Sequence, residues 1–366
     1  MQLTRRSILA LSGATLLSGG RAATRGFWLG TTRWPPEATL HGLAMVQAFL
    51  QDDCDMAAPM VLGGVPWTAA LAGDAFSPNL MRELTWKAPP GHPVCLSLGA
   101  LDTLRTGLAP LYAQTDNQAL PPDFADLEFD DSKIIAAYSA FCLQAAQIMQ
   151  PDWLIIGVEV NLLLNQRPDL WPAYVRLHQA CVAHLRQHVP DQKIGFSIAG
   201  LHYLGLLDDA DPTIQAREML SLAASVDIVG WSVYPHTSWD VQLPLTPAFF
   251  DFISDFAAKS GKPVAITESG MTSQRVWIGL VPLSGSPEAQ AQVMTAMLAA
   301  AQSGGWQFVV NWASHDYPEL LKLFPPETRE LGEIWVWTGL VGPNGEAKQV
   351  TKVWQDALAL RYQQPG

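Results

Sequence analysis

The chain has 366 residues, of which 49% are hydrophobic and 15% are charged, so it is able to bury a large core. Its formal net charge is −12 at pH 7, and it has no run rich in lysine and arginine after the first few residues. Because nucleic-acid-binding proteins carry clustered positive charge, this composition excludes a typical member of that class.

Residues 1–23 have the pattern of an export signal. Two arginines precede an apolar run, 8–17, which is too short to span a bilayer, and small residues follow it. The segment 4–9 resembles a twin-arginine signal, and an ordinary secretory signal is the alternative. Either signal predicts that the mature protein, 24–366, is periplasmic or secreted, with no stable membrane insertion.

Eight short apolar runs follow along the chain, each bounded by residues that favour turns. Each run is nearly continuous rather than alternating, which is typical of a strand buried on both faces of a sheet. Longer stretches between them have apolar residues at helical spacing, namely 132–149, 171–189, 246–261 and 286–305. The eight runs are 27–32, 54–62, 93–101, 153–160, 193–201, 226–235, 263–270 and 308–314.

Strands that alternate with helices indicate a parallel sheet with right-handed crossovers. Eight such units predict a closed (β/α)8 barrel, the TIM-barrel fold, in a single α/β domain over 24–366. The rival is an open doubly wound sheet, but no glycine-rich phosphate loop follows the first strand run. The polar, proline-containing segment 112–131 is interpreted as a surface insertion.

The four cysteines form no CxxC pair, so we expect buried thiols rather than a metal or redox motif. A disulfide remains open, because sequence spacing cannot establish one. The histidines follow no ligand spacing either, so we expect neither a metal site nor a cofactor.

In a barrel of this type, the active site lies at the carboxyl ends of the strands. Glu159 ends the fourth strand run and Glu268 ends the seventh. Carboxyl groups about 5–5.5 Å apart suit retaining glycoside hydrolysis, in which one donates a proton and the other attacks the anomeric carbon. The sequence therefore predicts a two-glutamate active site at the barrel mouth, although either glutamate alone could be a structural strand-end carboxylate.

Several short motifs resemble clan A of the glycoside hydrolases. The sequence GVEVN, 157–161, resembles the fourth-strand signature of family 53, the arabinogalactan endo-β-1,4-galactanases, and 226–235 and 262–270 resemble its sixth and seventh strands. The segment 337–350 resembles the closing segment of such enzymes. The resemblance covers roughly 27–358, and its short motifs support the clan better than one family.

This resemblance implies a role for four residues. Glu159 is expected to be the general acid/base and Glu268 the nucleophile. Tyr234 is expected to orient Glu268 through a hydrogen bond, and Trp312 to form the floor of the central sugar subsite.

One position departs from the clan pattern. The asparagine that normally precedes the acid/base and contacts the sugar 2-hydroxyl is Val158 in this chain. The departure is consistent with a different sugar, with another donor such as Asn161 or His202, or with an inactive relative.

The chain has 14 tryptophans, and sugar rings stack on aromatic faces. An acidic cleft lined by tryptophan suits a neutral or basic polysaccharide, although core packing is the alternative for each tryptophan. The histidine at 315 is a further candidate sugar ligand. The remaining candidate substrate-binding residues are Trp34, Trp67, Trp231, Arg33 and His236.

The leading hypothesis is an exported, monomeric retaining β-glycoside hydrolase, an O-glycosyl hydrolase that cleaves a polysaccharide or oligosaccharide. The alternative is a catalytically silent barrel that binds glycan in an envelope or exopolysaccharide system. A metal-dependent barrel hydrolase would need clustered histidine and aspartate ligands, which the sequence does not display. The identity of the glycan stays open.

Overall fold

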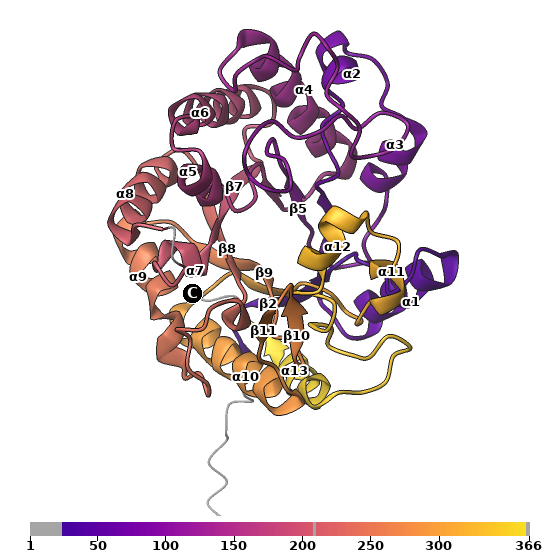
Figure 1. Ribbon diagram of the computed structural model, residues 1–366, viewed down its shortest axis with the longest axis vertical. Coiled ribbons are helices and arrows are strands. Elements are labelled where there is room, and N and C mark those ends of the chain that lie inside the picture. Colours follow the sequence, from indigo (N-terminus) through magenta and orange to yellow (C-terminus); the bar gives the residue numbers. More distant parts are fainter. Residues whose placement is uncertain (1–23, 208–209, 364–366) are drawn as a thin grey trace, which may run out of the picture.

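The computed structural model describes residues 24–207 and 210–363. A ring of parallel strands lies at the centre of the molecule with helices around it, which confirms the predicted single-domain (β/α)8 barrel (Figure 1). Each predicted strand run contains a barrel strand. The strands are β2 (Trp28–Thr32), β3 (Met56–Ala58), β4 (Met60–Val61), β5 (Cys95–Leu98), β6 (Trp153–Ile155), β7 (Lys193–Ala199), β8 (Ile228–Val233), β9 (Val264–Ser269) and β12 (Phe308–Asn311).

The barrel closes through its second strand, which is interrupted at Pro59 into β3 and β4. β3 pairs with β2 on one side, and β4 pairs with β5 on the other. The gap is bridged because the Ala57 N–H donates to the Pro93 carbonyl at 3.0 Å and the Ser97 N–H donates to the Pro59 carbonyl at 3.0 Å. Since Pro59 itself has no N–H to donate, the interruption falls where the strand changes partner.

Several helices begin or end at recognisable caps. Asp131 caps the helix at 132–149, and Ser286 caps the helix at 287–304 by accepting from the Ala289 N–H. Gly305 ends the latter helix with φ +62°, a conformation that glycine adopts without strain. The helices are α1 (Leu40–Asp52), α2 (Trp67–Ala72), α3 (Pro78–Leu84), α4 (Ser132–Met149), α5 (Asn161–Gln166), α6 (Trp171–His188), α7 (Gly200–Tyr203), α8 (Pro212–Ala223), α9 (Asp251–Ser260), α10 (Pro287–Gly304), α11 (Pro318–Leu321), α12 (Pro326–Gly332) and α13 (Gln349–Leu358), with 3₁₀ turns η1 (Pro235–Thr237) and η2 (Pro247–Phe250).

Two apolar layers hold the barrel together. Alternate side chains of each strand face either the barrel interior or the helices. On β8, Ile228 belongs to the interior cluster, while Val229 and Trp231 belong to the layer between strands and helices. The interior cluster comprises Met56, Ala58, Cys95, Trp153, Ile155, Val158, Ile228, Ala265, Phe308 and Val310.

The segment 112–131 is more than the surface insertion that the sequence suggested. Phe124 and Phe129 are buried in the main core, where Phe124 packs 6.0 Å from Trp67 and Phe129 packs edge-on to Tyr174. The other side chains of the segment are mostly exposed or partly exposed, so it lies at the surface as expected and these two aromatic side chains anchor it to the core. All four cysteines are buried and none forms a disulfide.

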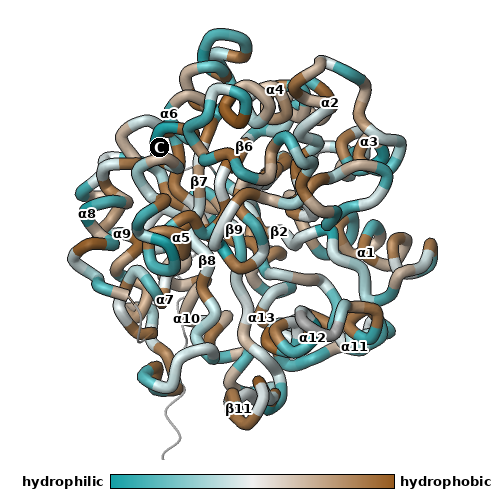
Figure 2. The backbone as a smooth tube through the Cα atoms, turned by 45° about the horizontal axis from the view of Figure 1, so that its top comes forward, coloured by the Kyte–Doolittle hydropathy of each residue, from teal (hydrophilic) through white to brown (hydrophobic). Residues whose placement is uncertain are grey.

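The two ends of the described chain meet. β1 (Thr24–Arg25) pairs in parallel with β13 (Arg361–Tyr362), and the Trp28 and Tyr362 rings stack at 3.8 Å. A separate hairpin, β10 (Val276–Ile278) with β11 (Val281–Leu283), projects at the periphery with strongly apolar residues (Figure 2). No helix within 24–207 or 210–363 is both long and apolar enough to cross a membrane.

Candidate active site

Glu159 lies just beyond the end of β6, in the turn that leads into α5. Its backbone is left-handed, with φ +52°, which is uncommon for a residue other than glycine. Its N–H donates to Oγ of Ser197 on β7 at 2.9 Å, and its Oε1 accepts from Oγ of Ser232 on β8 at 2.7 Å. Hydrogen bonds to two neighbouring strands therefore fix a turn that is strained by itself.

Arg105 holds the other carboxylate oxygen of Glu159. It lies in the loop after β5, again with a left-handed backbone, φ +57°. Its Nη2 lies 3.2 Å from Oε2 of Glu159, its Nε donates to the Val158 carbonyl, and its Nη1 donates to the Asp102 and Thr103 carbonyls. The guanidinium thus ties the loop after the third barrel strand to the end of the fourth.

Glu268 points into the barrel because of a bulge in β9. Val264 and Ile266 face the helices, so strict alternation would send Glu268 the same way. The register with β8 slips instead: Trp231 pairs with Ile266, and Ser232 pairs with Glu268. Thr267 is the extra residue, and the slip turns Glu268 toward the barrel interior.

Glu268 is buried, with only 8% of its surface exposed. Its Oε1 accepts a hydrogen bond of 2.5 Å from the hydroxyl of Tyr234. Burial, followed by the charge of Glu159, raises the pKa of Glu268 to about 8, and the hydrogen bond from Tyr234 and the charge of Arg105 oppose the rise. The same burial and the neighbouring Glu268 raise the pKa of the Tyr234 hydroxyl well above its usual range.

The two glutamates share one site. Ser232 is the register partner of Glu268 and at the same time donates to Glu159. The charge of Glu159 also contributes to the raised pKa of Glu268. Residues from the ends of β6, β8 and β9, together with the loop after β5, therefore place two carboxyl groups at the C-terminal end of the barrel.

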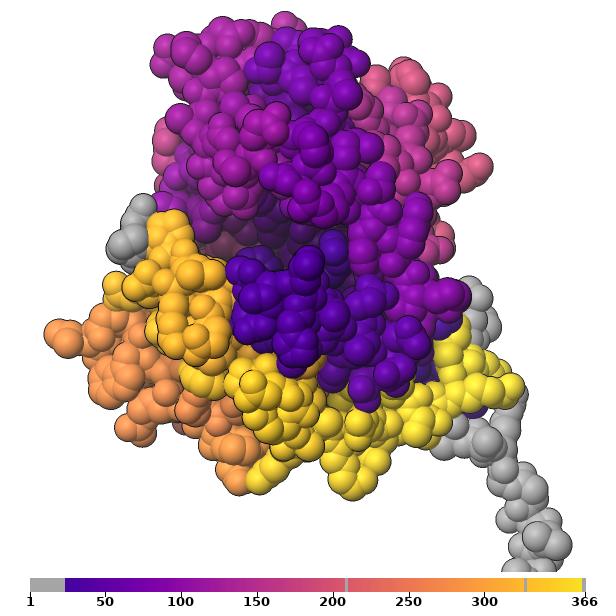
Figure 3. Space-filling view, turned by 90° about the vertical axis from the view of Figure 1, so that its right-hand side faces the viewer, coloured from indigo at the N-terminus to yellow at the C-terminus, as the bar shows by residue number. Residues whose placement is uncertain are grey.

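An aromatic wall lies next to this pair. Trp312, directly after β12, donates from Nε1 to the Tyr317 hydroxyl at 2.9 Å, and its ring lies 5.2 Å from that of Trp34. Trp335 packs edge-on to Tyr234 at 5.9 Å. In the space-filling view the surface is hollowed between the purple and indigo parts of the chain, beside the orange-yellow segment that carries α11 and α12 (Figure 3). That segment follows the C-terminal end of β12, so the hollow beside it lies at the C-terminal face of the barrel.

Three sequence-predicted contacts are corrected, because their side chains are completely buried. Trp67 donates from Nε1 to the Ala109 carbonyl at 2.9 Å. Trp231 faces the helices, where its ring packs edge-on to Tyr203 at 5.0 Å. Asn161 bonds to the Ala199 backbone and to Gln215. None of the three offers a surface to a ligand.

His236 is also buried, and its Nε2 donates to the Ile334 carbonyl at 2.9 Å, so it ties η1 to the segment before the aromatic Trp335. Burial lowers its pKa to about 4, which leaves the ring neutral at pH 7. His315 is buried as well, and its Nδ1 lies 2.9 Å from the Ser314 hydroxyl. These two histidines therefore have structural partners rather than an open face.

His202, Arg33 and Trp34 are partly exposed. The Arg33 guanidinium lies 4.9 Å above the ring of Trp86, and burial lowers its pKa. Their contact with a substrate stays a prediction. Val158 is 4% exposed and belongs to the apolar interior cluster, directly beside Glu159.

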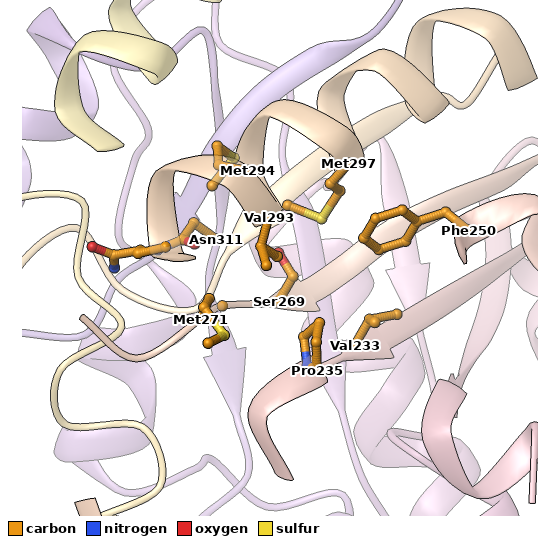
Figure 4. A pocket seen from close by; sticks show the side chains of 11 residues that line it. Val233, Pro235, Phe250, Ser269, Met271, Val293, Met294, Met297 and Asn311 are labelled. Carbon is orange, nitrogen blue, oxygen red and sulfur yellow. The ribbon is translucent and has the colours of Figure 1, made fainter. Parts of the chain in front are cut away.

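A separate pocket lies behind the barrel wall rather than at its mouth (Figure 4). Methionine and valine side chains from α10 face the ends of β8 and β9 across it, and neither glutamate lines it. Asn311, one of its polar residues, already donates to the Ala313 and Thr338 carbonyls. The lining residues are Val233, Pro235, Phe250, Ser269, Gly270, Met271, Gln290, Val293, Met294, Met297 and Asn311.

Sequence reasoning missed Arg105, Ser232 and Ser197. Arg105 follows a strand run, as Arg33 does, so the same reasoning could have proposed it. Asp102 shapes its loop by accepting from the Thr106 N–H at 2.7 Å. Ser232 and Ser197 stand inside apolar strand runs, where a small hydroxyl gives no signal of its own.

The geometry contains no obvious metal centre: within the residues that the structure describes, no group of three or more His, Cys, Asp or Glu side chains could hold an ion. The site consists of two carboxyls, one guanidinium, hydroxyls and indoles. Such groups support proton transfer and nucleophilic attack on a neutral substrate.

Comparisons with known proteins find likeness in fold. No protein-family model matches the chain, and no curated protein matches it in sequence. Among solved structures, a GH5_18 variant from Streptomyces cattleya in complex with Manβ1-4GlcNAc is similar with a TM-score of 0.64 and 15% identity, over 93% of this chain and 82% of that one. The GH53 catalytic domain of Ignisphaera aggregans has a TM-score of 0.55 and 17% identity, over 92% of both chains.

The exo-β-1,4-mannosidase Op5Man5 from Opitutaceae bacterium strain TAV5 is similar with a TM-score of 0.58 and 16% identity. The alignment covers 92% of this chain but only 60% of that enzyme. The fold is therefore the (β/α)8 barrel found in these glycoside hydrolases. Because GH5 and GH53 structures resemble the chain at similar identity, the likeness does not single out family 53.

Proposed function

We propose that the protein is a retaining β-glycoside hydrolase that cleaves a polysaccharide, with Glu159 as general acid/base and Glu268 as nucleophile. The observation that carries the proposal is the convergence of the two carboxyls through Ser232, which pairs with Glu268 and hydrogen-bonds Glu159. The barrels with similar folds, named as a mannosidase, GH5 and GH53 proteins, support the reaction class.

The proposed reaction has two steps. The Glu268 carboxylate attacks the anomeric carbon while Glu159 gives its proton to the departing glycosidic oxygen, so a glycosyl ester forms and the leaving alcohol is released. Glu159 then takes a proton from water, the resulting oxygen attacks the same carbon, and Glu268 is freed as a carboxylate. Tyr234 holds Glu268 in place, and Trp312 and Trp34 offer aromatic surface for a sugar ring.

We further propose that this reaction takes place outside the cytoplasm, because of the export signal predicted over 1–23, which lies outside the described residues. A monomer remains our expectation. Fractionation of producing cells and measurement of the mass of the purified protein in solution test both points. Full-length protein retained in the cytoplasm would contradict the export signal.

Purified protein incubated with a panel of β-linked polysaccharides and aryl β-glycosides tests the activity. We expect release of sugars whose anomeric configuration, followed by NMR, is retained. Glu268→Gln should abolish cleavage of every substrate, while Glu159→Gln should spare part of the cleavage of aryl glycosides with good leaving groups, which need no proton. Products of inverted configuration would contradict Glu268 as nucleophile.

Glu83→Gln is a matched control for these variants. Glu83 is also a partly buried glutamate that accepts a tyrosine hydrogen bond, from Tyr112 at 2.6 Å, but it lies on α3 away from the carboxyl pair. We expect Glu83→Gln to hydrolyse substrates at the unaltered rate. Equal losses in all three variants would indicate a general effect on folding.

The alternative is a barrel that binds glycan without cleaving it, and Val158 favours it. An apolar, buried side chain directly before Glu159 offers no hydrogen bond to a sugar hydroxyl. Affinity electrophoresis in gels containing each polysaccharide separates the two functions. Retarded migration of unaltered protein, with no cleavage of any substrate in the panel, would favour the binding function.

A further inference from the structure

The hairpin β10–β11 follows β9, the strand that carries Glu268, so it leaves the barrel at the C-terminal face (Figure 2). Its base is fixed, because the N–H and the hydroxyl of Ser273 both donate to the Trp337 carbonyl, at 3.0 and 3.1 Å. Trp337 lies two residues after Trp335, whose ring packs edge-on to that of Tyr234. The hairpin is therefore attached to the loop that carries the aromatic wall beside the carboxyl pair.

A two-residue turn fixes the register of this hairpin. Gly279 and Leu280 form the turn between the two strands. Gly279 has φ +57°, a conformation that tight hairpin turns require at their first position and that glycine adopts without strain. The resulting register pairs Val276 with Leu283, and both side chains are buried. One face of the hairpin is therefore packed against the protein.

The opposite face of the hairpin carries an indole beside a proline ring. Trp277 is the register partner of Pro282, and because side chains alternate along a strand, both lie on the face turned away from Val276 and Leu283. Directly opposed residues of an antiparallel pair are in contact range, so the proline ring limits the positions open to the indole. Trp277 is 53% exposed, and no ring of another described residue packs on it. Its indole therefore offers a supported, open apolar surface.

The chemistry of this surface suits a sugar ring. The axial C–H groups of a pyranose form an apolar patch that packs on an indole, and the indole N–H is a donor for a sugar hydroxyl. The attachment of the hairpin to Trp337 makes the surface continuous with the proposed active-site mouth. A lipid surface or a second copy of the chain would be contacted first through the tip, where Leu280 is 93% exposed. The net charge of −12 disfavours adsorption to an anionic membrane.

We propose that Trp277, supported by Pro282, is a stacking platform for a sugar residue of the substrate that lies beyond the bond to be cleaved. This inference rests on the proposed function and specifies its substrate class, a polysaccharide chain long enough to reach from Glu268 to the hairpin. The platform adds binding energy that a short glycoside does not receive. The protein therefore prefers long chains to small glycosides.

Binding to the platform is measurable without catalysis. In a Glu268→Gln background the polymer stays intact, and affinity electrophoresis in gels containing β-galactan, β-mannan, β-xylan or β-glucan gives a dissociation constant for each. For the polymer bound most tightly, Trp277→Ala should weaken binding by about 3- to 10-fold, the usual effect of a lost aromatic contact. Trp277→Phe keeps a ring and should lose less. Equal binding by Trp277→Ala and its parent, or no retardation by any of the four polymers, would overturn the proposal.

Leu280→Ala is the matched control, because Leu280 is also apolar and exposed on this hairpin but lies in the turn. We expect its binding to equal that of the parent. The same loss in Leu280→Ala and Trp277→Ala would assign the contact to the apolar tip and overturn the platform. Flotation with phosphatidylcholine vesicles and the mass in solution test the other occupants. Vesicle binding or dimerisation that depends on Trp277, in place of glycan binding, would also overturn the proposal.

The length of the substrate gives a second readout. In Trp277→Ala, KM for the polymer should rise by about 3- to 10-fold while kcat changes little, because the lost contact serves ground state and transition state alike. An aryl β-glycoside of one sugar reaches no farther than the carboxyl pair, so its hydrolysis should be affected less. If Trp277 only stabilised the hairpin, both substrates would lose activity equally, and that result would overturn the proposal.

The two levels of inference fail separately. If no substrate in the panel is hydrolysed, the proposed function fails, while affinity electrophoresis still decides whether Trp277 binds a glycan chain. If hydrolysis with retention is found but neither binding nor KM depends on Trp277, the function stands and the platform fails.

Discussion

Ser232 and Glu159 are 73 positions apart in the sequence, yet Oγ of Ser232 donates a 2.7 Å hydrogen bond to Oε1 of Glu159. The same serine is the register partner of Glu268 on the next strand. Ser232 on β8 thus contacts Glu159 through its side chain and pairs with Glu268 through its backbone, so it fixes the positions of both carboxyl-bearing residues.

Ser232→Ala should lower kcat/KM by about 10- to 100-fold and lower the free energy of unfolding by no more than about 3 kcal/mol. A hydrogen bond to a charged group contributes roughly 1.5–3 kcal/mol, and here it orients the carboxyl that we propose as general acid/base. Steady-state kinetics on the best substrate measures the loss. Ser303→Ala, which removes a hydroxyl bonded only within α10, is the control and should be neutral. An unchanged rate in Ser232→Ala would show that Glu159 is held without this bond.

Glu268→Gln should stabilise the protein more at pH 8.5 than at pH 5. The pKa of Glu268 is raised from the ordinary 4.5 to about 8, so the folded state keeps a proton that the unfolded state has released. The protonated Glu268 therefore favours folding below about pH 4.5, and this contribution is lost as the pH rises toward 8. When this contribution is fully lost, the free energy of unfolding of the unaltered protein is lower by at most roughly 5 kcal/mol.

Urea unfolding of Glu268→Gln and the unaltered protein across this pH range measures that difference. Glu319→Gln serves as the control. The Glu319 side chain is 60% exposed, so the difference in unfolding free energy between this variant and the unaltered protein should not change with pH. If the difference for Glu268→Gln is also independent of pH, the raised pKa of Glu268 is contradicted.

Gly230→Ala should damage the bulge that aims Glu268. A Cβ at this position would lie 2.4 Å from Cγ2 and 2.7 Å from Oγ1 of Thr267, so Thr267 would have to move. We expect a fall of about 1–3 kcal/mol in the free energy of unfolding, as for other overpacked sites, together with a larger loss of activity than of stability. Chemical denaturation and kinetics measured on the same preparation test this. Full activity would mean that Glu268 keeps its direction without the present bulge.

Lys348→Met should destabilise the protein by about 3–5 kcal/mol at pH 8, because it leaves the Asp316 carboxylate buried without its partner. Lys348 Nζ lies 2.9 and 3.1 Å from the two Asp316 oxygens and donates to the Gly339 carbonyl at 2.7 Å. Burial raises the pKa of Asp316 to about 6, so at pH 5 Asp316 is largely protonated and the loss should be smaller.

Thermal unfolding of Lys348→Met at pH 5 and pH 8 provides the comparison. Lys352→Met breaks an exposed ion pair on α13, with Asp356, and should not change stability measurably. A Lys348→Met effect as small as that of Lys352→Met would mean that the buried pair is compensated elsewhere.

The fold could be predicted because its signals are local. Each barrel strand is apolar on both faces, and α4 and α10 begin at caps that the sequence displays. The break at Pro59 was missed, since β3 and β4 together look like one apolar run. The two glutamates were found because a charged residue at the end of such a run stands out.

The surroundings of the glutamates could not be predicted in the same way. Trp67 and Trp231 occur in apolar strands and helices, and the sequence does not tell which face of a doubly buried strand a side chain takes. The bulge at Thr267 reverses that face for Glu268 without any sequence mark. The contact of Arg105 with Glu159 joins loops 54 positions apart, and only the closed barrel brings them together.

The pairing of β1 with β13 places both ends of the described chain at the amino-terminal rim of the cylinder, since β1 directly precedes β2 and Trp28 stacks on Tyr362. A tether, an affinity tag or a fused module joined at either end would therefore leave from the side opposite Glu159 and Glu268. A protein immobilised through a linker attached at Thr24 or next to Tyr362 would have its barrel mouth turned outward, toward a polymer of the kind that we propose as substrate.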